Sequence, residues 1–192
     1  ELSKLSIRAP LETAITLSHR PSARFAELAV RCLSVEEAFL PARDALVQMG
    51  EGARSALLSQ VRNPEQSALV MRVLGEMNDP VIRRSLLEFL SDADEEIRYR
   101  AIRALALRGL SSEGDRGAVF LAIERELVFC DQVRSQKGVG SREDYEWAIE
   151  RIFGLFGLIH PGRPFRRMLL SLRSADRYQR SFALEVLEES LA

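Results

Sequence analysis

The sequence predicts an all-α fold, a right-handed α-solenoid of about five stacked helical pairs. Three observations predict it. Strong helix formers dominate the 192 residues, with only 7 Pro and 11 Gly, and no long β-branched run competes with them. Apolar residues recur at helical spacing, and no strand pattern survives. The chain also repeats itself.

The internal repeat has an offset of 82 residues, which places Val70 over Ile152. When the two segments are aligned from these residues onward without a gap, their apolar positions and turn residues match through three helices. The aligned pairs are Leu74/Phe156, Gly75/Gly157, Leu86/Met168, Leu87/Leu169, Leu90/Leu172, Asp94/Asp176, Arg98/Arg180, Ala101/Ala183 and Leu105/Leu187. A shorter offset of 31 residues relates Asn63 to Asp94. Two helices and a tight turn of this length make one α-solenoid unit.

Several of the expected helices have a local start or stop signal. Asp79 before Pro80, Asp94 before two glutamates, and Ser141 are predicted N-caps, while Gly50 and Gly109 are predicted stops. Residues 136–141 are predicted to form a flexible loop. The expected helices span residues 22–34, 35–49, 52–62, 64–77, a stretch from 80, 94–108, 115–135, 142–159, 164–173 and 177–191.

The run from Asp94 through Ile97, Arg98, Ala101 and Ala104-Leu105 resembles the first-helix signature of HEAT repeats, D-x-x-V-R-x-x-A-x-x-A-L. The copy that begins at Asp176 keeps most of this pattern, although it has Gln179 at the aliphatic position. The resemblance covers about residues 63–110 and 142–192. It implies one domain of HEAT-like helical hairpins over residues 1–192.

A narrower resemblance rests on residues 148–191. This stretch is similar to the closing HEAT repeats of certain bacterial multidomain membrane proteins, in which a module similar to the ATP/ADP translocases is joined to such repeats. The resemblance implies a cytoplasmic domain tethered to a membrane protein. Because the chain begins at Glu1 without a Met, we expect it to be excised from a larger protein.

Composition bounds the possible partners. The net charge of −1 gives no overall field that attracts nucleic acid or an acidic membrane. The longest apolar run, residues 152–159, is much shorter than the roughly 20 residues that span a bilayer. This segment is therefore predicted to be a buried helix without membrane insertion. Cys32 and Cys130 are isolated and fit a reducing compartment as small hydrophobic residues.

The sequence carries no recognisable catalytic, metal or cofactor motif. His19 and His160 have no partner at ligand spacing, and the close glycine pairs follow no strand and match no phosphate-binding loop. The acidic run at residues 91–96 is explained by helix capping and lacks the frame of a calcium loop. We therefore expect no enzyme, no cofactor and no metal.

Arginines are the candidate interaction residues. Arg84 and Arg166 are equivalent in the repeat, as are Arg98 and Arg180, so these pairs are candidates for a row that binds phosphate groups. The alternative is a ladder of surface ion pairs with neighbouring carboxylates. Lys137, in the predicted loop, is the fifth candidate. Trp147 is expected to be packed.

The sequence favours a non-enzymatic protein-interaction or scaffold domain whose partner is another protein or an adjacent domain. One alternative is a nucleic-acid-binding HEAT-like domain that uses the arginine rows, resembling the alkyl-base DNA glycosylases. Another is self-association through an exposed groove. The sequence leaves the oligomeric state open.

Overall fold

The computed structural model describes residues 9–110, 112–135 and 141–191, and within these ranges every regular element is a helix. The chain divides into two compact units, Glu1–Arg108 and Gly109–Ala192, called here unit 1 and unit 2. The prediction of an all-α fold is confirmed.

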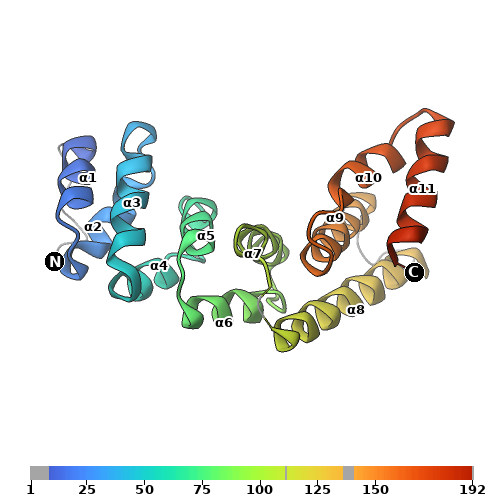
Figure 1. Ribbon diagram of the computed structural model, residues 1–192, viewed down its shortest axis with the longest axis horizontal. Coiled ribbons are helices and arrows are strands. Elements are labelled where there is room, and N and C mark those ends of the chain that lie inside the picture. The colour runs from blue at the N-terminus through green and yellow to red at the C-terminus, as the bar shows by residue number, and fades with distance from the viewer. Residues whose placement is uncertain (1–8, 111, 136–140, 192) are drawn as a thin grey trace. The chain divides into compact units, whose positions relative to one another are not determined.

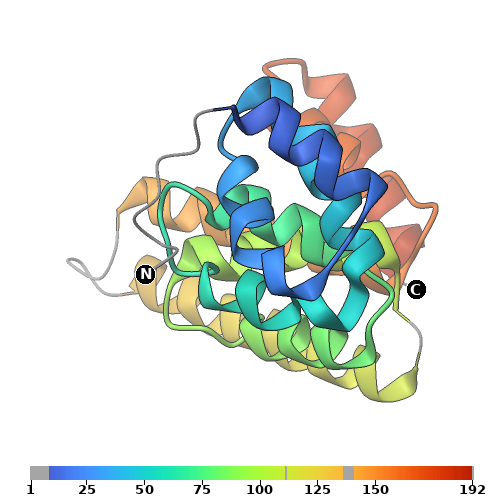
Figure 2. The same ribbon diagram turned by 90° about the vertical axis from the view of Figure 1, so that its left-hand side faces the viewer.

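The described residues of unit 1 form seven α-helices, α1 to α7, and three short 3-10 helices that precede α2, α3 and α4. The α-helices are α1 (Pro10–His19), α2 (Ala26–Cys32), α3 (Phe39–Met49), α4 (Arg54–Ser59), α5 (Ser67–Glu76), α6 (Pro80–Phe89) and α7 (Glu95–Arg108). The odd-numbered helices follow one another: α1 packs on α3, α3 on α5, and α5 on α7 (Figure 1). Figure 2, turned by 90°, shows α1 beside α3 as well.

The core of unit 1 lies between these successive helices. Small alanines are fully buried where α1 and α3 meet, among them Ala14, Ala42 and Ala45. Larger residues such as Leu74, Leu86 and Leu105 fill the space around α5, α6 and α7. Alternation of small and large side chains lets helices approach closely without leaving voids.

Unit 2 consists of α8 (Glu113–Ser135), α9 (Arg142–Ile159), α10 (Phe165–Leu172) and α11 (Arg177–Leu191). Each of these helices packs on the next along the chain. Phe153 of α9 packs with Phe165, Met168 and Leu169 of α10, and Leu187 of α11 lies against this cluster. The predicted burial of the apolar run 152–159 is therefore confirmed in most positions, Ile152 and Ile159 among them.

Most predicted caps are confirmed. Asp79 Oδ1 accepts hydrogen bonds from the N–H groups of Val81 and Ile82 at 2.7 and 3.3 Å. Ser141 and Asp144 form a reciprocal capping box at the start of α9. Gly50 and Gly109 adopt positive φ values of 55° and 73° where α3 and α7 end, as expected of glycine stops.

Several helix boundaries and one helix differ from the sequence prediction. α2 begins at Ala26 and α4 ends at Ser59, where helices over residues 22–34 and 52–62 were expected. α5 begins three residues later than expected, and α8 begins two residues earlier, because the side chain of Ser112 caps it by accepting from the Asp115 N–H. α1 was missed. Its threonines and serine are weak helix formers, so its stability comes from burial of Ala14 and Leu17 against its neighbours. Residues 136–140 of the predicted flexible loop lie outside the described residues.

Candidate functional site

Arg98 and Arg180, two of the predicted interaction residues, hold the turns that precede α7 and α11. Arg98 Nη1 donates to the carbonyl oxygens of Asp92 and Ala93 at 2.9 and 3.1 Å. Arg180 Nη1 donates to those of Ser174 and Ala175 at 2.6 and 2.9 Å. The four acceptors are themselves related by the 82-residue offset. Both arginines therefore have the same structural use.

Side-chain caps complete the same two turns. Asp94 Oδ1 accepts from the Glu96 N–H at 2.9 Å, and Asp176 Oδ1 accepts from the Tyr178 N–H at 2.8 Å. Asp92 Oδ1 and Ser174 Oγ occupy equivalent positions and accept from the N–H of Asp94 and Asp176, at 2.9 and 3.1 Å. Residues that are equivalent in the sequence repeat therefore form equivalent hydrogen bonds in these two turns.

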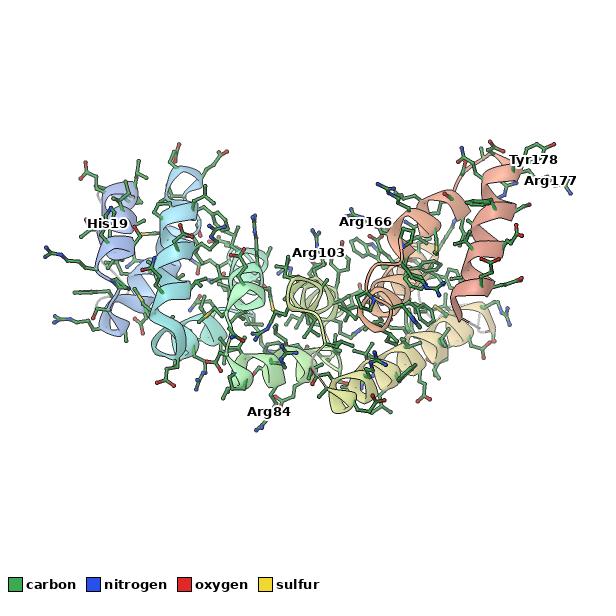
Figure 3. All side chains as sticks on the ribbon, in the orientation of Figure 1. His19, Arg84, Arg103, Arg166, Arg177 and Tyr178 are labelled. Atoms are coloured by element: carbon green, nitrogen blue, oxygen red, sulfur yellow. The ribbon has the colours of Figure 1, made fainter. Side chains whose placement is uncertain are left out.

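The other candidates are dispersed. Arg84 on α6 and Arg166 on α10 are exposed, and each belongs to a different unit. In Figure 3 Arg84 projects from the opposite side of unit 1 to Arg103 of α7. Lys137 lies outside the described residues. That these residues bind an anion stays a prediction.

A groove of about 530 Å³ lies between α5 and α7 in unit 1 and is called here the α5/α7 groove. Its residues on α7 are spaced by three, four, seven, eight and eleven positions from Glu96, so they share one helix face. They are Glu96, Tyr99, Arg100, Arg103, Ala104 and Leu107, and the residues on α5 are Ala68, Leu69, Met71 and Arg72. Arg103 points outward from this face in Figure 3.

Gly75 permits the close approach of the two helices beneath the groove. A Cβ added at Gly75 would lie 2.7 Å from the Ala104 oxygen and 2.9 Å from its Cα. Backbone atoms cannot move aside as a flexible side chain does, so only glycine fits here. Met71 and Ala104 are consequently buried and form an apolar floor between the helices.

Arginines dominate the walls of the groove. Arg100 Nε lies 2.9 Å from a carboxylate oxygen of Glu96, and Arg72 Nε lies 3.7 Å from Glu76. Arg103 is exposed and lies over the Tyr99 ring, 5.9 Å from its centroid. Among the side chains that the structure describes, no carboxylate pairs with Arg103. The lining therefore carries three guanidinium groups and one carboxylate.

A second hollow of about 550 Å³ adjoins the groove at Leu107, which lines both. Its other lining residues are Arg43, Gly75, Glu76, Met77, Asn78, Arg83 and Arg108. Burial and the neighbouring charge of Arg83 lower the pKa of Arg108. Leu107 itself is 59% exposed, so an apolar side chain stands in the open between two sets of arginines.

Sequence reasoning missed this site. It selected Arg98 of α7 as a candidate, but not Arg100 or Arg103 of the same helix. One sequence signal could have indicated the groove: Tyr99, Arg103 and Leu107 are spaced by four residues, which places them on one helix face. The residues that α5 adds to the groove, above all Arg72, could not be predicted from the sequence, because their place in the groove depends on how α5 packs against α7.

Unit 2 exposes aromatic residues as well as Arg177 on the corresponding helix, α11. Tyr178 and Phe182 of α11 are 88% and 67% exposed. Trp147 of α9 is 36% exposed, which is more than the packed position that the sequence suggested. In contrast, Arg151 of α9 is fully buried and forms a two-point ion pair with Glu126 of α8.

Other reactive groups form no site in the described part of the chain. No three His, Cys, Asp or Glu side chains there lie close enough together to hold a metal ion. Cys32 and Cys130 are buried, and burial raises the pKa of each thiol, so both are protonated at neutral pH. No described helix combines the length and the apolar character needed to cross a membrane.

Comparison with models of known protein families gives no match, and neither does comparison with curated proteins. The assignment of a function therefore depends on the α5/α7 groove and on the repeated turns.

Proposed function

We propose that this chain is a non-enzymatic protein-interaction domain, and that the α5/α7 groove receives a segment of a partner protein or of an adjacent domain. One observation carries the proposal: an apolar floor bordered by arginines lies open along a full face of α7. Interaction surfaces commonly combine an apolar centre with a rim of polar and charged groups, and arginine is enriched in them.

The finer fold that we propose is a right-handed α-solenoid of HEAT-like hairpins. The succession of α1, α3, α5 and α7, each packed on the next, supports it. The identical turns at Arg98 and Arg180 support it as well, because solenoid repeats reuse one local structure. The resemblance of residues 148–191 further suggests a cytoplasmic module tethered to a transporter-like membrane protein.

Nucleic acid is the second candidate partner, because arginines and the aromatic Tyr99 line the α5/α7 groove together. Arginine and aromatic residues together bind single strands by charge and base stacking. Because Arg98 donates to carbonyl oxygens of its own turn, a continuous row of nucleic-acid-binding arginines is less well supported than binding in the single α5/α7 groove.

A peptide-display selection against the 192-residue chain tests the proposed function. We expect selection to enrich related peptides, and Leu107→Asn to abolish the enrichment. Leu121→Asn is the matched control, because Leu121 on α8 is also exposed and lies outside the groove. Failure of the wild-type chain to enrich any peptide family, or unchanged enrichment with Leu107→Asn, contradicts the proposal.

A further inference from the structure

We infer that the α5/α7 groove selects an acidic peptide segment in which an apolar residue lies next to carboxylates. This inference rests on the proposed function and adds the chemistry of the partner. Its ligand is a short stretch of another polypeptide, bound by charge at the walls of the groove and by apolar contact at its floor.

The charge of the groove requires an anionic partner. Arg72 and Arg100 already have a carboxylate within 4 Å, whereas among the described side chains Arg103 contacts the Tyr99 ring and no carboxylate. Tyr99 lies beneath the guanidinium of Arg103 and helps to hold it in place, which lowers the entropy lost when a ligand binds. Arg103 is therefore the primary carboxylate contact, because its planar guanidinium can donate two parallel hydrogen bonds.

The floor of the groove requires an apolar side chain beside that carboxylate. Met71 and Ala104 are buried beneath it, and Leu69 is half-buried at its side. Leu107 stands exposed at the end of the groove. A leucine-sized residue placed against Leu69 and Leu107 removes apolar surface from water on both sides of the contact.

The length of the groove sets the length of the segment. The α7 face runs from Glu96 to Leu107, which corresponds to about 16 Å along a helix axis. An extended peptide of about five residues spans this distance. The second hollow continues past Leu107 with Arg43, Arg83 and Arg108, so a longer segment meets a second set of guanidinium groups on the far side of its apolar residue.

A peptide fits this surface better than a nucleic acid. Glu96 stands at one end of the groove and Glu76 lines the second hollow, so a regularly spaced phosphate chain meets a like charge at two points. Tyr99 is the one aromatic residue among the described residues that line the groove, and Arg103 already covers its ring. The surface therefore offers no stacking platform for successive bases.

Fluorescence anisotropy with the 192-residue chain tests the inference. The probe is a fluorescein-labelled ten-residue peptide in which leucines alternate with pairs of glutamates, and its counterpart has glutamine at every glutamate. We expect the glutamate peptide to bind about tenfold more tightly, with the difference shrinking as salt is added. Arg103→Glu should weaken its binding by about tenfold or more, and Arg103→Gln should have a smaller effect.

Arg84→Glu is the matched control, because it makes the same charge change on an exposed arginine on the opposite side of unit 1. It should bind the glutamate peptide as the wild type does, and circular dichroism should show that all variants are folded. Equal binding of the two peptides overturns the inference and leaves the proposed function in place. Equal weakening by Arg84→Glu and Arg103→Glu also overturns it, as does binding of a short DNA strand that exceeds peptide binding and depends on Arg103.

Discussion

The two repeat copies, about residues 63–110 and 142–192, share a turn but differ in the surface that their helices build. The first copy lies mostly in unit 1 and the second lies in unit 2. Gly75 and Gly157 are equivalent in the sequence. A Cβ at Gly75 would collide with the backbone of α7, whereas a Cβ at Gly157 would meet nothing within 4 Å. α7 packs against both α5 and α6, while α11 packs chiefly against α10.

The positions that line the α5/α7 groove have changed character in the second copy. Arg100 corresponds to Phe182, and Arg103 to Glu185. Leu69, at the side of the groove, corresponds to Arg151, which is buried against α8. A shared local structure is therefore compatible with two different surfaces, because the turn and the interhelical face depend on separate residues.

The largest expected loss of stability comes from replacing Arg151 with leucine, the residue that the first copy has at the equivalent position 69. Arg151→Leu leaves the Glu126 carboxylate, which is 3% exposed, buried without its guanidinium. We expect the free energy of unfolding to fall by about 3–5 kcal/mol, measured by urea denaturation. Adding Glu126→Leu should restore most of the loss, since two apolar groups can replace a buried pair.

The control for that prediction is Arg142→Leu, which breaks the exposed pair of Arg142 with Glu146. It should cost under about 1 kcal/mol. A similar loss from Arg142→Leu and Arg151→Leu would mean that burial does not distinguish the two ion pairs.

Alanine substitutions at Gly75 and Gly157 should give the next largest changes in stability, with opposite signs in the two copies. Gly75→Ala should destabilise the chain by about 1–3 kcal/mol, because the added methyl group forces α5 away from α7. Gly157→Ala should stabilise it by up to about 1 kcal/mol through helix propensity. Chemical denaturation of both variants measures the difference, and equal signs would contradict the packing difference between the copies.

The shared turn predicts a smaller and equal effect. Arg98→Ala and Arg180→Ala each remove two hydrogen bonds from a guanidinium group to backbone carbonyls. We expect each variant to lose about 1 kcal/mol, since both side chains are partly exposed. Arg84→Ala should cause no measurable loss. A large loss at one turn with none at the other would show that only one of them is structural.

The smallest effect depends on pH. Burial alone would raise the pKa of Asp92, but hydrogen bonds from the Asp94 N–H and the Arg62 guanidinium, together with the charges of Arg62 and Arg98, hold the pKa below its usual value. The ionised carboxylate therefore stabilises the fold above the ordinary aspartate pKa of about 4, and this stability is lost as the pH falls through the lower folded pKa.

Asp92→Ser, which copies Ser174 of the second repeat, should remove this contribution. We expect it to cost under about 1 kcal/mol at neutral pH and to have less effect below about pH 3. Denaturation of wild type and variant at both pH values measures the difference. A constant difference across this range would contradict the role of the Asp92 charge.

Several elements were predictable because their signals are local. The caps at Asp79, Asp94 and Ser141 bond to N–H groups two or three residues away, so side-chain chemistry and spacing were enough to predict them. Helix α1 was missed because its threonines and serine weaken the local signal. The equivalence of Arg98 and Arg180 was also predictable, but not that both would bond to carbonyls of their own turns.

The sequence by itself determined the all-α class, most helix boundaries and the repeated turn, because propensity, capping and the 82-residue offset act within a few neighbouring residues. Tertiary structure decided which helices approach closely, and with that the α5/α7 groove, the difference between Gly75 and Gly157, and the burial of Arg151 with Glu126. These features need residues from two helices about 25–35 positions apart, and their energies depend on desolvation and packing that no single helix contains.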